Sequence, residues 1–419
     1  MGKGKQSRFF YGYIVLAAIW VIYFFNVATP LYGVSAINAN MVAATGFDAA
    51  VVGTAVSIST AMQGVTSPVV GTLVAKKGVR LPLIIGSVLL VISGFCLAFL
   101  PVTPAGFILF YGVMVGAGMG FAGILTTQCT VNEWFAQKKA MAIALAVSAG
   151  GVGGFVLPLV CQAISGVRWN LGWLFIGATC CISVILSVFV MKNRPADVGE
   201  VPDGRAYAEK HAAVHGTTEA GPVYSLGKVF RTSAIWLVVV GSALRNVLYY
   251  ATVGHIVLYL VGNGIPNVQA VATISVMSMA SLIGRFVAGF ITGKVLSARM
   301  EGVLSNLFCT AAIVLLVFCG QSLLLMNLGG ALMGLGLGMG YISQPLVTTE
   351  CYGKENFSAI SGWTSILSYV AAAVGPLVAG LAAKATGSYV MIFLVFGGLS
   401  AVGGLIMLGI RKPDPAELE

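Results

Sequence analysis

Apolar residues fill the chain in long runs, and short breaks with glycine, proline or charge separate them. The hydrocarbon core of a bilayer, about 30 Å thick, requires roughly 20 apolar residues in a helix. Runs of this length therefore predict membrane-spanning helices. Twelve segments meet the rule: residues 11–33, 49–74, 81–100, 105–134, 140–166, 171–191, 233–262, 268–294, 302–321, 323–350, 357–385 and 388–410. The first run is too long for a cleaved signal peptide, so we expect it to remain as a helix.

The composition supports a membrane protein. Hydrophobic residues make up 58% of the 419 and charged residues 9%, whereas soluble domains carry about 25% charge. The 54 glycines follow no collagen period and suit close helix packing in lipid. The eight cysteines lie scattered in or beside apolar runs, so neither a disulfide framework nor a metal site is predicted. We expect an all-α membrane protein that functions as a monomer in the lipid bilayer.

The distribution of basic residues predicts the orientation. With the N-terminus inside, all but four of the 23 lysines and arginines fall on the cytoplasmic side. Arg168 and Lys384 fall outside, and Arg245 and Arg285 lie within spans. This asymmetry follows the positive-inside rule and places both termini in the cytoplasm of a cell with the chain in its inner (plasma) membrane. The net charge of +10 shows no basic patch with interleaved aromatics, so no nucleic-acid partner is expected.

A polar stretch divides the spans into two groups of six. Residues 192–232 are too rich in charge, glycine and proline to fold alone, so they are predicted to form a cytoplasmic linker between an N-terminal bundle, 1–191, and a C-terminal bundle, 233–419. The linker histidines His211 and His215 are four residues apart, but no further ligands accompany them. We assign them no role.

The two halves repeat one another. Gly71 precedes a basic loop after the second span, and Gly289 does so after the eighth, 218 residues later. A Gly-Ala-Gly-Met-Gly-Phe run at 116–121 recurs as Gly-Leu-Gly-Met-Gly-Tyr at 336–341, and each of these spans ends in a glutamate, Glu133 or Glu350. Internal repeats of this kind in transporters place the substrate at the repeat interface near the bilayer midplane.

These features resemble the major facilitator superfamily. Within it, the run WFAQKKAMAIALAVSAG at 134–150 is similar to the signature that opens the fifth helix of monocarboxylate transporters, and RPADVG at 194–199 and FRT at 230–232 resemble linker signatures of monocarboxylate and oxalate/formate-type carriers. The resemblance implies twelve helices in two pseudo-symmetric bundles and secondary transport of small monocarboxylates such as L-lactate or pyruvate. It points to a bacterial lactate/pyruvate-type homologue and implies alternating access without a cofactor.

Arg285 is the strongest candidate for binding substrate. It lies nine residues from the predicted inner end of the eighth span, or roughly 13 Å at 1.5 Å per residue. Burying an arginine at such depth costs about 2.5–3.5 kcal/mol on insertion scales, and no carboxylate occurs in the middle of any span. A guanidinium holds a carboxylate by two parallel hydrogen bonds, and in the related families the corresponding arginine binds the substrate carboxylate. The alternative is an arginine satisfied by backbone carbonyls or by an acid of another helix.

Two other ionisable groups lie in the seventh span. Arg245 is interpreted as structural or gating rather than as a direct substrate ligand. His255 is the only histidine outside the linker and the only group at depth whose unperturbed pKa is near neutrality. It is therefore the candidate for proton coupling, with a neutral histidine donating to a facing hydroxyl as the equal alternative.

Several polar and apolar residues are weaker candidates for lining the substrate site: Tyr341, Tyr369, Asn26, Tyr32, Leu31 and Leu145. The aromatics among them can equally pack between helices. Glu133 and Glu350, near lysines at the inner ends of the fourth and tenth spans, are predicted to form a gate by pairing across the halves. Solvated helix ends are the alternative.

The chain departs from the animal monocarboxylate transporters at two positions. Leu31 follows Pro30 where the family has a lysine, and Ser281 stands where the family has an aspartate. Because those charges are tied to proton coupling, the coupling route does not transfer. We predict proton symport of a monocarboxylate, with proton-independent carboxylate exchange of the oxalate/formate type as the alternative. A membrane-embedded enzyme or receptor is disfavoured because the chain has no nucleotide loop and no paired midplane carboxylates.

Overall fold

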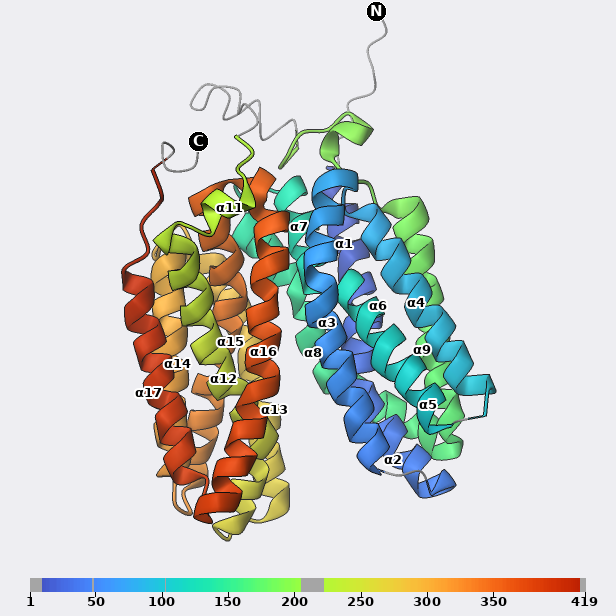
Figure 1. Ribbon diagram of the computed structural model, residues 1–419, viewed down its shortest axis with the longest axis vertical. Coiled ribbons are helices and arrows are strands. Elements are labelled where there is room, and N and C mark those ends of the chain that lie inside the picture. The colour runs from blue at the N-terminus through green and yellow to red at the C-terminus, as the bar shows by residue number, and fades with distance from the viewer. Residues whose placement is uncertain (1–9, 47–48, 102, 205–221, 415–419) are drawn as a thin grey trace, which may run out of the picture.

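The computed structural model describes residues 10–46, 49–101, 103–204 and 222–414. Its helices form two bundles that stand side by side (Figure 1). The first bundle contains α1 (Gly12–Tyr23), η1 (Phe24–Gly33), α2 (Val34–Thr45), α3 (Ala49–Lys77), α4 (Arg80–Phe99), α5 (Pro104–Phe107), η2 (Ile108–Val115), α6 (Gly116–Phe121), α7 (Ile124–Trp134), α8 (Lys139–Val167), α9 (Trp169–Ile185) and η3 (Leu186–Val190).

The second bundle follows two short linker helices, η4 (Pro195–Val198) and α11 (Leu226–Val229). It contains α12 (Ser233–Gly262), α13 (Asn267–Ile291), α14 (Ala298–Val317), α15 (Leu323–Tyr352), α16 (Lys354–Thr386) and α17 (Val390–Leu408).

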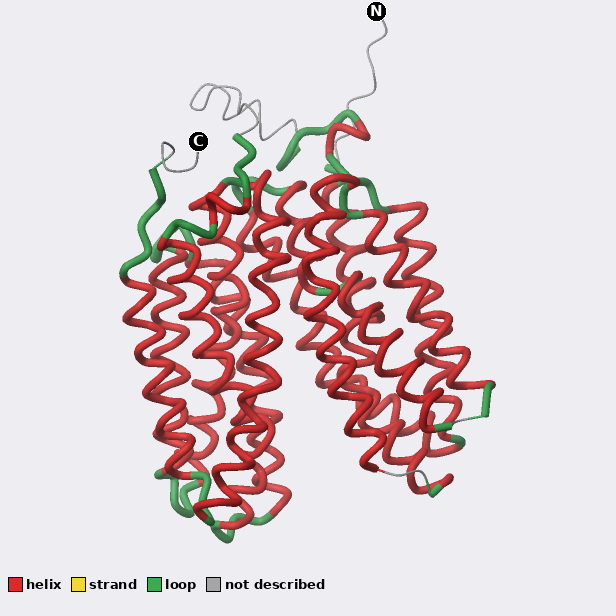
Figure 2. Tube along the Cα trace, viewed as in Figure 1, coloured by secondary structure: helices red, strands yellow, loops and turns green. Residues whose placement is uncertain are grey.

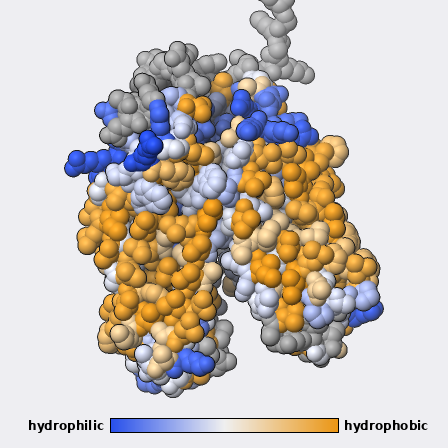
Figure 3. All heavy atoms as spheres, in the orientation of Figure 1, coloured by the Kyte–Doolittle hydropathy of each residue, from blue (hydrophilic) through white to orange (hydrophobic). Residues whose placement is uncertain are grey.

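The helices cross the molecule as the hydrophobic pattern predicts. Within the described residues, eleven are long and apolar enough to span a membrane. The 29-residue α3 is more polar and completes a fold of twelve spans. Apolar residues cover most of the face of the two bundles that Figure 3 shows. Together with the spanning helices, this confirms the prediction of an all-α membrane fold.

Several predicted boundaries differ from the helix ends, and three of these differences have an identifiable local cause. The first helix continues past 33 to Thr45, because the segment around Pro30 is accommodated as a π-helix, η1, rather than ending the helix. Helix α14 begins at Ala298 instead of 302, since the Ser297 hydroxyl caps it by accepting from the Met300 N–H at 3.3 Å. Helix α13 ends at Ile291 instead of 294, and Gly293 then takes a positive φ of 75°.

The two ends of the molecule differ. The described linker segments and both ends of the described chain gather at one end, here called the terminal end (Figure 2). The bundles meet there and separate at the opposite, open end, where the surface is hollowed between them (Figure 3). Helix α3 packs along α16, and α8 along α13.

Small residues allow the bundles to approach at these contacts. A Cβ added to Gly71 would lie 3.0 Å from the Cα of Gly362, and one added to Gly289 would lie 2.9 Å from the Cβ of Ala144. Gly71 and Gly289, paired in the sequence repeat, therefore make equivalent close contacts between the bundles.

The linker is attached to both bundles. Asp203 adopts a positive φ of 61°, and its Oδ2 accepts hydrogen bonds from the backbone N–H of Ala136 at 3.0 Å and of Gln137 at 2.7 Å. On the other side, Asn356 at the start of α16 accepts from the Tyr224 N–H at 2.8 Å. The linker histidines His211 and His215 lie outside the described residues.

Candidate substrate-binding site

A cavity of about 440 Å³ lies between the bundles, and residues of both bundles line it. Its volume falls within the range of about 300–1,000 Å³ that is typical of small-molecule sites. Six tyrosines contribute to its wall: Tyr23, Tyr32, Tyr249, Tyr250, Tyr341 and Tyr369. The wall is thus both aromatic and rich in hydroxyl groups.

Arg285 lines this cavity from α13 and is 6% exposed. Its Nη1 donates to the carbonyl oxygen of Val147 on α8, in the other bundle. Its guanidinium carbon lies 4.8 Å from the ring centroid of Tyr341, within cation–π range. Its Nε has no hydrogen-bond partner among the described residues. With Nη1 occupied, the edge formed by Nε and Nη2 retains the fork that a carboxylate accepts.

Because α13 ends earlier than predicted, Arg285 is six residues from the helix end, roughly 9 Å at 1.5 Å per residue.

Among the described residues, the positive charge of Arg285 has no carboxylate as a counter-charge. Every acidic residue of the sequence within a membrane helix lies near a helix end at the terminal end of the molecule, namely Glu133, Glu301, Glu350 and Glu355. In the described part of the chain, no carboxylate forms an ion pair with the guanidinium. A buried charge that is only partly satisfied by a carbonyl favours an incoming anion.

Arg245 also reaches the cavity, from α12, but its side chain is 2% exposed. Its Nη1 donates to the Ser305 hydroxyl at 2.9 Å and its Nη2 to the Asn246 amide oxygen at 3.2 Å. A Cβ added to Gly340 would lie 2.7 Å from Nη2. Arg245 therefore packs against the glycine run of α15, just before Tyr341.

The structure separates the weaker predicted lining residues into two groups. Tyr341, Tyr369, Tyr32 and Leu31 line the cavity. Asn26 and Leu145 are not among the residues that line it. The Asn26 amide is fully buried and donates to the Ser87 hydroxyl on α4 at 2.7 Å, a placement that favours packing between helices. Leu145 is 39% exposed on α8.

His255, on α12, is not among the residues that line the cavity. Its Nε2 forms a hydrogen bond of 2.9 Å with the carbonyl oxygen of Pro376, and its ring lies 5.1 Å from that of Tyr389, centroid to centroid. Its Nδ1 is buried without a partner among the described residues.

The predicted gate residues lie at the terminal end, on facing bundles. Glu133 lies one residue before the end of α7 and is half-buried, and the positive charge of Lys354 in the second bundle acts on it. Glu350 is exposed near the end of α15, and Lys139 of the first bundle acts on it. A direct contact also links the bundles, because the Asn132 amide donates to the Lys354 carbonyl at 3.2 Å.

Sequence reasoning missed several lining residues. Tyr23, Gln63 and Gln128 face the cavity from the first bundle, and the Gln128 amide donates to the Tyr341 carbonyl at 3.4 Å. A glutamine in the middle of an apolar span was the available signal. Ser281 and Leu31, which replace the charged residues of the animal transporters, both line the cavity.

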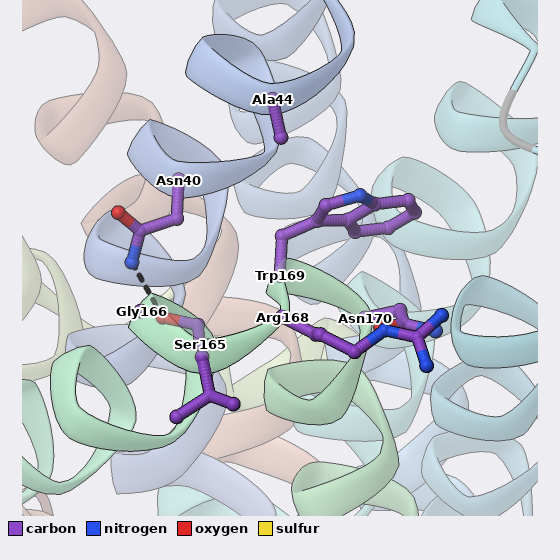
Figure 4. A pocket seen from close by; sticks show the side chains of 8 residues that line it. Asn40, Ala44, Ser165, Gly166, Arg168, Trp169 and Asn170 are labelled. Atoms are coloured by element: carbon purple, nitrogen blue, oxygen red, sulfur yellow. Dashed lines mark hydrogen bonds between the residues drawn. The ribbon is translucent and has the colours of Figure 1, made fainter.

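A second pocket of about 500 Å³ lies at the open end of the first bundle (Figure 4). Asn40 of α2 donates there to the Ser165 hydroxyl at 2.8 Å, beside Arg168 at the start of α9. Within the described residues, no group of three or more His, Cys, Asp and Glu side chains could hold a metal.

A family model described as Major Facilitator Superfamily matches residues 9–371. The chain belongs to the major facilitator superfamily. This facilitator is similar to monocarboxylate transporter 12 of Rattus norvegicus, at 26% identity over 73% of the chain and 66% of the relative. It is also similar to monocarboxylate transporter 4 of the same species, at 24% identity over 84% of the chain and 73% of the relative.

Solved structures show the same fold. The E. coli fucose:proton symporter aligns with a TM-score of 0.71 at 14% identity and covers 96% of this facilitator and 100% of the symporter. The human organic anion transporter MFSD10 aligns with a TM-score of 0.69 at 13% identity and covers 94% and 99%. Membership of the major facilitator superfamily, shown by the family model, makes the facilitator a membrane transporter rather than an enzyme.

Proposed function

We propose that this facilitator carries small monocarboxylates, such as L-lactate or pyruvate, and that Arg285 binds the carboxylate. The observation that carries the proposal is a buried guanidinium that lines a central cavity, lacks a carboxylate partner among the described residues, and has an unpartnered Nε. A carboxylate on this fork would satisfy the charge and fix the orientation of the substrate. The resemblance to animal monocarboxylate transporters supports the same class.

The arrangement of the bundles supports alternating access. In the proposed cycle, the present arrangement receives substrate from the open end, and the bundles then rock about the cavity until the terminal end opens. The close helix contacts at Gly71 and Gly289 would separate in that step. In the proposed orientation both termini are cytoplasmic, in the plasma membrane, so the present state faces outward.

Proton symport is the proposed coupling. Entry of an anion against an inside-negative potential costs about 2.3 kcal/mol per charge per 100 mV, and a co-transported proton makes the cycle electroneutral. His255 remains the predicted carrier. Proton-independent carboxylate exchange is the second candidate, because Arg245 places another cation at the cavity wall, as the binding of a dianion would require.

Uptake by liposomes tests both proposals. The purified protein is reconstituted, and uptake of lactate, pyruvate, oxalate and succinate is measured with and without an inward proton gradient. We expect lactate or pyruvate to accumulate with the gradient and the dicarboxylates to be excluded. Uptake of oxalate without any effect of the gradient would favour exchange, and no carboxylate uptake at all would overturn the assignment.

A further inference from the structure

A buried carboxylate at the terminal end of the second bundle has no role in the substrate site. Glu301 lies in the first turn of α14 and is fully buried. One of its oxygens, Oε1, accepts a hydrogen bond from the Thr292 hydroxyl, in the segment that joins α13 to α14. The other oxygen, Oε2, is buried and has no hydrogen-bond partner among the described residues.

The repeat shows that the fold does not require an acid at this position. Helices α4 and α14 both have 20 residues, and their first residues, Arg80 and Ala298, are 218 positions apart, the same offset as between Gly71 and Gly289. The counterpart of Glu301 is therefore Leu83, which is also fully buried. Where the first bundle has an ordinary apolar core residue, the second bundle has a carboxylate.

The charged groups that the structure describes around Glu301 offer no compensation for a negative charge there. Another carboxylate, Glu350 on α15, is the charged group whose electrostatic effect reaches the Glu301 carboxyl. Arg299, on α14 itself, donates to the carbonyl oxygen of Ile410 after α17 at 3.0 Å. Lys139 of the first bundle acts on Glu350. An ionised Glu301 would thus be a buried negative charge with a like charge near it, which is strongly unfavourable.

We propose that Glu301 is a proton-binding site, which carries a proton while the terminal end is closed and releases it when that end opens. The proton resides on Oε2, and Thr292 holds Oε1 in either state. When the bundles separate, water reaches the carboxyl group, hydrates the carboxylate and accepts the proton, so one O–H bond breaks and a hydronium ion forms. This proposal rests on the proton symport proposed above and adds the group that would release the proton.

The test compares two modes of transport by the full chain in liposomes. Accumulation driven by a proton gradient requires binding and release of the proton, whereas exchange of labelled for unlabelled lactate requires no net proton movement. Glu301→Gln keeps an oxygen for Thr292 but cannot ionise. We expect this variant to lose accumulation above equilibrium and to retain exchange. The matched control Glu355→Gln, which alters a half-buried carboxylate in the first turn of α16 at the same end, should retain both.

Three outcomes would overturn the proposal. Accumulation by Glu301→Gln equal to wild type would show that the proton travels elsewhere. Loss of exchange together with accumulation would indicate a structural role. Infrared difference spectra of the purified protein give a measurement independent of transport. A protonated carboxyl band that persists unchanged in the variant would exclude Glu301 as the group that gives this band. Absence of gradient-driven accumulation in the wild type would instead refute proton symport itself, and this site with it.

Discussion

Arg285 in the second bundle donates to the carbonyl oxygen of Val147 in the first. The contact crosses the plane between the bundles at the wall of the cavity. Val147 belongs to the run at 134–150, which is similar to the fifth-helix signature of monocarboxylate transporters. A substrate carboxylate on the remaining edge of the guanidinium would therefore lie where the two bundles meet. Binding at this position is well placed to influence their relative movement.

Arg285→Lys should weaken substrate binding while keeping the charge. Lysine cannot form two parallel hydrogen bonds with a carboxylate, and a hydrogen bond to a charged group contributes about 1.5–3 kcal/mol. We expect the KM for uptake to rise about ten- to a hundred-fold. Measurement of KM for lactate in liposomes checks this, and a KM equal to that of the wild type would mean that charge alone is recognised.

Tyr341 should contribute through its ring rather than its hydroxyl. Its ring covers the guanidinium of Arg285 at 4.8 Å, a contact worth about 0.5–2 kcal/mol. Tyr341→Ala should therefore weaken lactate binding by roughly two- to thirty-fold, and Tyr341→Phe should remain near the wild type. Calorimetric titration of the detergent-solubilised protein measures both. Equal losses of lactate affinity in the two variants would show that the hydroxyl group of Tyr341, rather than its ring, contributes to binding.

Gly340 should not tolerate a side chain. An added Cβ would lie 2.7 Å from Nη2 of Arg245, and overpacking of this kind costs about 1–3 kcal/mol. Gly340→Ala should lower the thermal unfolding temperature, as measured by differential scanning fluorimetry. Gly398→Ala on α17 is the control, because a Cβ there meets nothing within 4 Å. Equal unfolding temperatures for the two variants would contradict the packing described for Arg245.

His255→Gln tests the histidine predicted from the sequence. The amide can preserve a hydrogen bond to the Pro376 carbonyl but cannot bind a proton near neutral pH. If His255 carries the proton, lactate accumulation driven by a proton gradient should be lost while exchange persists. Uptake that keeps its response to the gradient would exclude His255 as a proton carrier.

The sequence predicts the framework well because spans in lipid depend on length and hydropathy. The segment 233–262 matches α12 residue for residue. The sequence also shows that Arg285 has no acidic residue in the middle of any span to balance its charge. The boundaries at Thr45 and Ala298 depend on local features, a π-helix around Pro30 and the Ser297 cap, which hydropathy does not register.

The surroundings of single side chains were beyond reach of the sequence. Asn26 and Tyr32 are similar polar candidates on the first span, yet of the two only Tyr32 lines the cavity. The rotation of the helix about its own axis decides which of its side chains faces the cavity, and the sequence does not give that rotation. The sequence does not single out Glu301, because its burial depends on how the first turn of α14 packs. Only the packing in the folded structure distinguishes the buried Glu301 from an ordinary solvated glutamate at a helix end.

The most direct test of the central claim is lactate uptake by liposomes that contain Arg285→Ala. Removal of the guanidinium leaves the cavity without the proposed carboxylate ligand, so we expect specific uptake to fall to the level of empty liposomes at concentrations where the wild type is saturated. Thermal unfolding in detergent controls for folding. Uptake by a folded Arg285→Ala variant with the affinity of the wild type would contradict the account.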